Sequence, residues 1–186
     1  MHPIFARPGE PSVPILFITA ADFDRTLENV DDRERTFVRA AGYEPKPGRY
    51  LAMPAADGKL AGILFGLENA DEPVKDLFRP GQLSGLLPAG TYRFANAPHD
   101  ARLAALAFAL GAYQFTRYRR ADARNARLVL PDGVDGDDLT RIIEAVTLAR
   151  DLINTPANDL GPAELEDAAR KLAARHNATI SAVVGV

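Results

Sequence analysis

Short apolar runs alternate with helical patterns between residues 13 and 130, and this alternation restricts the fold more than any other feature of the sequence. Two stretches have the apolar spacing of helices: Asp31–Ala41, which ends at Gly42, and His99–Tyr118, which is apolar on nearly every face. The remaining runs are short and apolar, and they predict strands at Val13–Ile18, Arg49–Met53, Lys59–Leu67, Thr91–Ala95 and Arg127–Leu130. Strands and helices in alternation indicate a layered α/β domain.

One pair of these strands should be antiparallel. The second and third runs are joined by PAADG, in which Asp57 and Gly58 tolerate the positive φ angles of a tight hairpin turn. Residues 69–90 contain LLPAG near their end and predict a loop that crosses to the next strand. A single hairpin within an alternating order predicts a mixed sheet.

The pattern changes after Gly133. From residue 139 to residue 153 apolar side chains repeat every three and four positions, behind two aspartates that favour a helix start, and this is the clearest helix of the chain. The helix must end near Asn154 because Pro156 has no amide hydrogen and forces the preceding residue into an extended conformation.

Beyond this break, Gly161-Pro162 opens a second helix, and Thr179–Val186 predicts a further strand. One helix and one strand are too small to bury a core, so we expect the sequence to stop inside a structural unit, and we expect its apolar surfaces to fold back or associate with another chain. The expected organisation is an α/β domain at 1–133, a linker helix at 134–155 and the start of another domain at 156–186.

Composition and motifs exclude several kinds of chemistry. The chain has no cysteine, which excludes disulfides, cysteine-based zinc sites and thiol nucleophiles, and none of its three histidines has a partner at a metal-binding spacing. Neither a glycine-rich phosphate loop nor a GxSxG nucleophile elbow is present. Two acidic groups could offer oxygen ligands to magnesium or manganese, although both stand where carboxylates stabilise a following helix: Asp22 with Asp24, and Asp135 with Asp137 and Asp138.

Charge and hydropathy give expectations about partners and location. The formal net charge of -3 argues against broad capture of nucleic acid. A cluster of arginines is predicted to be a solvated helix end and loop: Arg117, Arg119, Arg120, Arg124 and Arg127. Because no secretory signal and no apolar window long enough for a membrane span are visible, we expect no membrane contact and a cytoplasmic location.

The most distinctive stretch runs from Ala149 to Gly161, with the sequence ARDLINTPANDLG. Several of its side chains can bond to the local backbone, as at a helix end followed by an Asx-type turn. From the residues alone, its function stays open.

With its continuation to Ala178, RDLINTPANDLGPAELEDAARKLAARHNA, this stretch resembles the junction of the leucyl aminopeptidases, the cytosol aminopeptidase family of two-metal exopeptidases. In that family the pattern RDL-x-N-x-P-A-N, followed by proline and an amphipathic helix, marks the entry into the catalytic domain. Upstream, the segments LAGILFGL at 60–67, LPAGTY at 87–92 and LGAYQFTRY at 110–118 are similar to the amino-terminal domain of a bacterial branch of the family. The resemblance covers roughly residues 10–186 and is strongest after residue 87.

The resemblance implies a macro-domain-like amino-terminal α/β domain, a long connecting helix, and a peptidase domain of which this chain holds only the first helix and strand. The family's metal ligands lie in motifs similar to GKG-x-x-FDTGG and NTDAEGR, and neither occurs here. The resemblance therefore implies no catalytic residue, no metal ligand and no cofactor in this chain. Arg150, Asn154, Pro156 and Asn158 match the junction motif and are expected to fix the linker relative to the catalytic domain.

For the parent protein, the resemblance implies removal of amino-terminal residues from peptides, two divalent metal ions (manganese or zinc) and a homo-oligomer, a hexamer in the family. This chain would then be a non-catalytic portion, inactive alone, that serves folding, assembly and active-site access. Two alternatives stay open: a stand-alone macro-like module for a nucleotide such as ADP-ribose, and a nucleic-acid-binding domain that uses the arginine cluster. Scattered glycines speak against the first alternative, and the acidic net charge speaks against the second.

Overall fold

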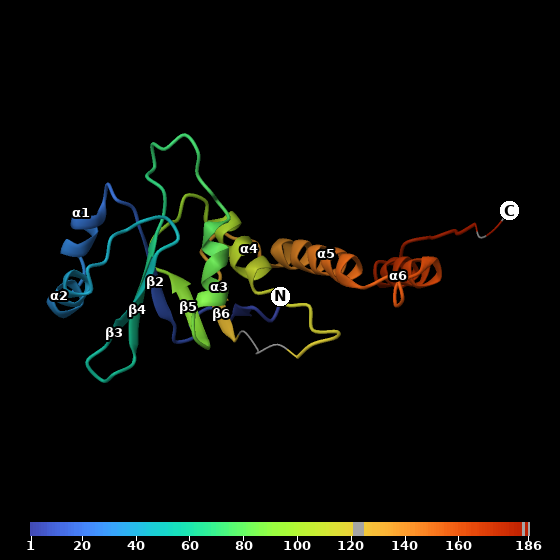
Figure 1. Ribbon diagram of the computed structural model, residues 1–186, viewed down its shortest axis with the longest axis horizontal. Helices are drawn as coiled ribbons and strands as arrows, with labels where there is room; N and C mark the ends of the chain where they lie inside the picture. The colour runs from blue at the N-terminus through green and yellow to red at the C-terminus, as the bar shows by residue number, and fades with distance from the viewer. Residues whose placement is uncertain (121–124, 184, 186) are drawn as a thin grey trace.

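The computed structural model describes residues 1–120, 125–183 and 185, and a six-stranded mixed sheet lies toward one end of it, between helices on both sides (Figure 1). Along the sheet the strands follow the order β1 (Phe5–Ala6), β6 (Ala126–Val129), β5 (Gly90–Phe94), β2 (Val13–Ile18), β4 (Leu60–Gly66) and β3 (Tyr50–Pro54). Neighbouring strands pair in parallel, except that β3 and β4 form the antiparallel hairpin. The predicted layered α/β fold with a mixed sheet is confirmed.

The central strand, β2, shows why its sequence is apolar at almost every position. It pairs with β4 on one side and β5 on the other, with Ile15 opposite both Ile63 and Phe94. Ile15 and Phe17 belong to one buried cluster, and Ile18 belongs to a second one. A strand that is buried on both faces of a sheet reads as a continuous apolar run rather than as an alternating one.

Helix α4 (Ala101–Gly111) covers one face of the sheet, and the first half of α5 (Gly136–Asn154) packs against it. Asp100 begins α4 by accepting a hydrogen bond from the backbone amide of Leu103 at 2.8 Å, and the helix then buries six consecutive residues, 104–109. Such burial on all sides requires neighbours around the helix. These are the sheet, α5, and the short helices η1 (Arg79–Gln82) and α3 (Leu83–Leu86).

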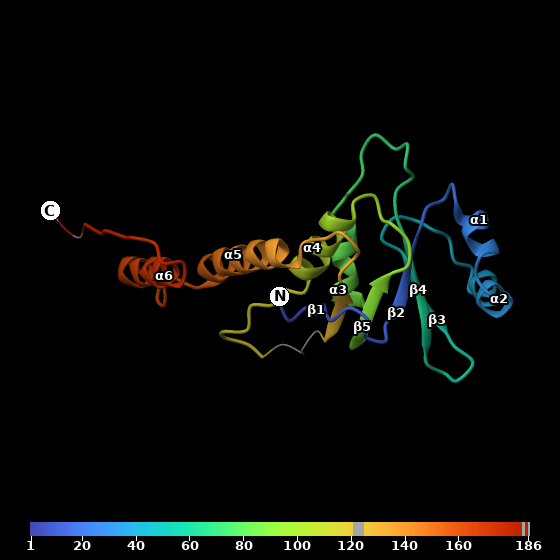
Figure 2. The same ribbon diagram turned by 180° about the vertical axis from the view of Figure 1, so that it is seen from behind.

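Helices α1 (Phe23–Glu28) and α2 (Asp32–Ala40) cover the opposite face over β2, β4 and β3, as the view from behind shows (Figure 2). The Asp31 carboxylate begins α2 by accepting hydrogen bonds from the amides of Arg33 and Glu34, both at 2.8 Å. The helix ends before Gly42, whose φ of +58° favours glycine. Both ends of this helix therefore match the predicted ones.

Three sequence predictions need correction. The helix predicted over His99–Tyr118 ends at Gly111, and residues 112–118 leave it to contact α5 instead. The crossing predicted as a loop at 69–90 contains η1 and α3, whose turns pack against α4. Residues 179–183 and 185 of the predicted last strand form no strand, because no neighbouring strand pairs with them; residues 184 and 186 lie outside the described part of the chain.

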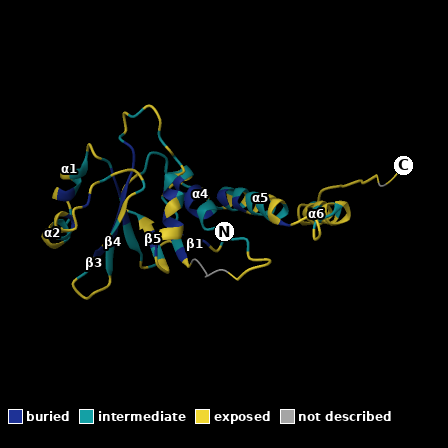
Figure 3. Cartoon of the chain, viewed as in Figure 1, coloured by how far each residue is buried: buried dark blue, intermediate teal, exposed yellow. Residues whose placement is uncertain are grey.

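The far end of the chain extends away from the sheet. Only the first half of α5 enters the core, through Leu139 and Ile143. Helix α6 (Pro162–Arg175) has no buried residue, and its surface is largely exposed (Figure 3). None of the helices in the described residues is long and apolar enough to cross a membrane.

Candidate functional site

The four residues of the predicted junction motif lie at the end of α5 and in the loop after it. Arg150 and Asn154, on the last turns of α5, both contact Tyr113 in the segment 112–118. The carbonyl oxygen of Pro156 accepts hydrogen bonds from the amides of the residues three and four positions later, at 2.9 and 3.0 Å, and so forms a turn. Asn158 is exposed in this turn. The structure thus brings the first two residues together and places the other two apart from them.

Tyr113 is the centre of the contacts around the first two. Its hydroxyl donates a hydrogen bond to Asp151 Oδ1 at 2.7 Å and accepts one from Asn154 Nδ2 at 3.1 Å. The guanidinium of Arg150 lies 5.3 Å from the centre of the Tyr113 ring, within the range of a cation–π contact. Burial, followed by the bond to Asp151, raises the pKa of the Tyr113 phenol, so the hydroxyl keeps the proton that it donates.

Arg150 also joins α5 to the end of α4. Its Nη1 donates a hydrogen bond to the carbonyl oxygen of Leu110 at 2.8 Å. The last carbonyls of a helix have no partner within the helix and carry partial negative charge, so a cation there is favourable. Tyr113, Asp151, Arg150 and Asn154, together with this carbonyl, form what we call the junction network.

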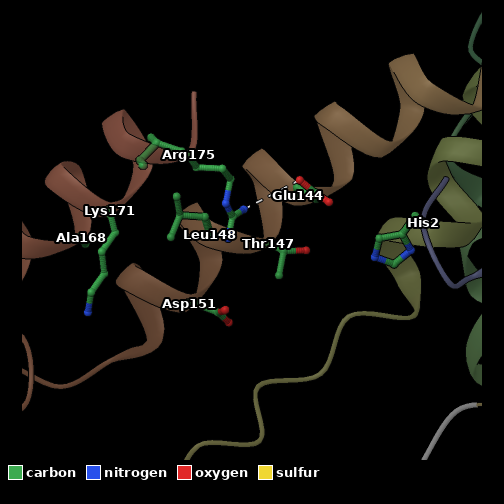
Figure 4. A pocket seen from close by; sticks show the side chains of 9 residues that line it. His2, Glu144, Thr147, Leu148, Asp151, Ala168, Lys171 and Arg175 are labelled. Carbon is green, nitrogen blue, oxygen red and sulfur yellow. Dashed lines mark ion pairs between the residues drawn. The ribbon is translucent and has the colours of Figure 1, made fainter. Parts of the chain in front are cut away.

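A groove of about 390 Å³ separates α5 from α6 (Figure 4). Acidic side chains of α5 line one side of the groove, basic side chains of α6 line the other, and apolar side chains of both helices lie between them. The lining consists of His2, Glu144, Thr147, Leu148, Asp151, Ala168, Lys171, Leu172 and Arg175. A single ion pair of 3.8 Å, between Arg175 and Glu144, crosses the groove in the described part of the chain, and both its side chains are at least half exposed. Pairs of this kind contribute little, about 0–1 kcal/mol.

The acidic groups are engaged in helix starts and turns. Asp135 accepts hydrogen bonds from the amides of Asp137 and Asp138 at 2.9 and 3.0 Å, which confirms the predicted helix start. Asp22 accepts from the amide of Thr19 at 2.7 Å, in the turn before α1, rather than from amides of α1. Within the described ranges, no group of three or more His, Cys or acidic side chains could hold a metal ion, so these residues do not fit a metal centre.

The order of strands reverses at β2, between β4 and β5. Open α/β sheets bind ligands at such a point, outside the carboxyl ends of the strands. Here the side chain of Asn96, just after β5, accepts a hydrogen bond from the amide of Phe17 at 2.8 Å and donates one to its carbonyl at 2.7 Å. The amide side chain thus continues the pairing of β5 with β2. Nothing in the sequence around Asn96 indicated this role.

The arginine cluster is spread over separate contacts. Because α4 ends at Gly111, the cluster lies outside that helix, and the predicted helix end is wrong. Arg117 lies 3.7 Å from Asp159, whereas Arg127 on β6 makes two hydrogen bonds of 3.1 Å to Glu10. Arg124 lies outside the described residues.

Comparison with known proteins decides the family. Residues 13–131, more than half of the chain, match the model of the M17 aminopeptidase N-terminal domain. This chain belongs to the M17 aminopeptidase family. It is 31% identical over 138 residues to a probable cytosol aminopeptidase of Geotalea uraniireducens (strain Rf4), an alignment that covers 61% of this chain and 28% of that protein.

Two solved structures extend the similarity to the fold. The cytosol aminopeptidase of Coxiella burnetii matches with a TM-score of 0.81 at 30% identity, over 94% of this chain and 38% of that one. The bottromycin maturation enzyme BotP, in complex with Mn, matches with a TM-score of 0.66 at 26% identity, over 89% of this chain and 37% of that one. The M17 chain therefore spans less than two fifths of the length of these proteins, and the similarity identifies it as an amino-terminal region of the family.

Proposed function

We propose that this M17 chain is a non-catalytic amino-terminal portion of a leucyl aminopeptidase-type metallo-exopeptidase. It would hold the linker helix in place and so serve the folding, assembly and active-site access of the parent. The observation that carries this proposal is the junction network, in which Tyr113 and Arg150 hold the second half of α5 against the end of α4. Whatever follows α5 then starts from a defined position on the sheet domain.

The proposal includes a division of the chain into an α/β domain at 1–133, a linker helix at 134–155 and the start of a peptidase domain at 156–186. The core cluster includes Leu139 and Ile143 at the start of α5 but no residue of α6, which supports a separate segment after the linker helix. Arg150 and Asn154 would fix the linker from within α5, while Pro156 and Asn158 would shape the loop that follows.

The parent would remove amino-terminal residues from peptides in the cytoplasm, with two divalent metal ions, manganese or zinc, as a homo-oligomer of six chains. The names of the relatives, cytosol aminopeptidase and an enzyme in complex with Mn, support this activity and metal class. The metal ions would polarise the scissile carbonyl and supply a hydroxide. Their family ligands belong to motifs similar to GKG-x-x-FDTGG and NTDAEGR, which this sequence does not contain.

A peptidase assay tests the proposal. The purified 186-residue chain, incubated with an amino-acyl chromogenic substrate and Mn²⁺ or Zn²⁺, should release product no faster than buffer does, because it lacks the ligand motifs. A full-length M17 aminopeptidase serves as the positive control. Turnover that co-purifies with the chain and disappears with a chelator would contradict the non-catalytic assignment, as would tight, stoichiometric binding of Mn²⁺ in calorimetry.

A further inference from the structure

A second set of contacts ties down the loop between α5 and α6, beyond the junction network. The Tyr118 hydroxyl donates a hydrogen bond to Asp159 Oδ2, and Arg117 Nη2 lies 3.7 Å from the same oxygen. Arg117 Nη1 also lies 3.5 Å from the hydroxyl oxygen of Thr155, the first residue after α5. We call these four side chains the latch: Arg117, Tyr118, Thr155 and Asp159.

Local contacts hold both halves of the latch in position. On one side, the Arg117 guanidinium lies 5.6 Å from the centre of the Tyr118 ring, and that ring lies 5.8 Å from the ring of Phe115. On the other side, Thr155 is buried, and its hydroxyl donates to the carbonyl of Asp151 at 2.7 Å. The turn at Pro156 places Asp159 within reach of Tyr118 and Arg117. Because both halves are already ordered, forming the latch costs little conformational entropy.

Few other contacts could set the direction of α6. The helix buries no residue, and the groove beside it is crossed in the described structure by the long, exposed ion pair between Arg175 and Glu144. The Arg117–Asp159 pair is almost as long, at 3.7 Å, and about half exposed, but the latch adds the Tyr118 hydrogen bond and acts on the loop directly after α5. A contact on the loop between α5 and α6 restricts the direction of α6 and of the chain that follows it.

We propose that the latch sets the direction in which the chain leaves the linker helix, with Arg117, Tyr118 and Asp159 as positioning residues. The bonds to Asp159 stop the loop from rotating about the end of α5, and α6 keeps one angle to the sheet domain. The idea that the latch orients a catalytic domain rests on the proposed function. The proposal that the latch fixes the angle of α6 does not depend on it.

The absence of cysteine allows a direct measurement of this angle. Spin labels attached to Arg39→Cys on α2 and Ala174→Cys on α6, both exposed positions, report the distance between the sheet domain and α6 by pulsed electron resonance. In the otherwise unchanged chain we expect one narrow distance distribution. Asp159→Ala, and separately the double change Arg117→Ala with Tyr118→Phe, should broaden it at least twofold with an unchanged melting temperature, because the latch lies outside the core.

Two further variants distinguish the latch from the ion pair that crosses the groove. Asp159→Asn keeps an acceptor for Tyr118 and should restore part of the narrow distribution. Arg175→Ala removes the ion pair to Glu144 and should leave the width unchanged. The proposal is overturned if Asp159→Ala leaves the distribution narrow, if only Arg175→Ala broadens it, or if the latch variants unfold the sheet domain. Peptidase activity of the chain alone would refute the proposed function without affecting this distance measurement.

Discussion

Tyr113 connects two parts of the chain because a phenol can donate and accept hydrogen bonds at once. It donates to Asp151 and accepts from Asn154, both on α5, while its own backbone lies just after α4. The raised pKa of this phenol keeps it protonated at neutral pH, and a deprotonated oxygen next to the Asp151 carboxylate would be repelled. The contact therefore depends on one proton at one oxygen.

Replacing Tyr113 with phenylalanine tests this contact. Tyr113→Phe keeps the ring under Arg150 but removes both hydrogen bonds, so we expect the free energy of unfolding to fall by about 1–2 kcal/mol. Urea denaturation followed by circular dichroism measures this change. Tyr50→Phe on β3, an exposed tyrosine, is the matched control and should change stability by less than about 0.5 kcal/mol. Equal effects of both variants would mean that the junction network does not stabilise the fold.

His2 provides a second contact that depends on protonation. Its Nδ1 accepts a hydrogen bond from the amide of Ile4 at 3.3 Å, which requires this nitrogen to be unprotonated. Burial lowers the pKa of His2 below its usual 6.5, and the nearby Glu144 only partly opposes this. Because the folded-state pKa is the lower one, the stabilisation is complete above pH 6.5 and is lost as pH falls through the folded pKa.

The unfolding midpoint in urea should therefore decrease as the pH falls below about 7. The loss amounts to at most about 1.4 kcal/mol for each unit by which the pKa is lowered. His2→Asn keeps an acceptor but cannot titrate, and it should flatten this part of the pH profile. The carboxyl pKa values of Glu10 and Glu68 are lowered in the fold, so the stability that these groups contribute is lost only at more acidic pH. A histidine NMR titration in which His2 titrates at or above 6.5 would refute the argument.

Among the elements, α4 shows most clearly how tertiary contacts override a helical pattern. Its apolar pattern continues to Tyr118, yet the helix ends at Gly111. At this point η1 and α3 approach so closely that a Cβ atom on Gly111 would lie 2.1 Å from the carbonyl oxygen of Gly81 in η1 and 2.8 Å from Ser84 Oγ in α3. The glycine therefore allows two backbones to touch where the chain leaves the helix.

Gly111→Ala distinguishes helix propensity from packing by the sign of its effect. Propensity alone predicts stabilisation of up to about 1 kcal/mol. The contact with Gly81 instead predicts destabilisation of about 1–3 kcal/mol, because backbone atoms must move apart. Thermal unfolding measures the difference, and Gly90→Ala is the control, since its Cβ would have ordinary contacts of 3.5 Å or more. An increase in melting temperature for Gly111→Ala would show that the backbone of η1 can move away to make room for the added methyl group.

The sequence predicted those elements that are determined by neighbouring residues along the chain. Apolar runs placed the five longer strands, Asp31 and Asp135 marked helix starts, and Asp57-Gly58 marked the hairpin. The end of α4 and the junction network were not predictable in this way, because they depend on pairs such as Tyr113 and Asp151 that are 38 positions apart. The junction motif drew attention to Arg150 and Asn154, but a single sequence does not show which residues they contact. The two-residue β1 was too short to detect, and for α1 the sequence indicated only a helix start at Asp22 and Asp24, not its extent.

At the scale of the whole molecule, the core and the projecting helices contribute unequally to stability. Leu139 and Ile143, in the first two turns of α5, are buried in the main cluster, whereas α6 buries nothing. The proposed domain boundary at Gly133 lies just before these two residues. The folding unit and the proposed domain can therefore differ by part of one helix.

Two shortened chains test where the folding unit ends. A chain of residues 1–160 lacks α6 and should melt within a few degrees of the full chain, since it keeps every residue of the core clusters. A chain of residues 1–135 loses the burial of Leu139 and Ile143, each worth about 1.5–3 kcal/mol. Together these losses, about 3–6 kcal/mol, approach only the lower end of the total stability of a small domain, about 5–15 kcal/mol, so this chain should melt well below the full chain. Thermal melting followed by circular dichroism distinguishes the outcomes. A cooperative transition of residues 1–135 near that of the full chain would place the end of the folding unit at the proposed boundary. A large decrease in the melting temperature of residues 1–160 would show that α6 supports the core.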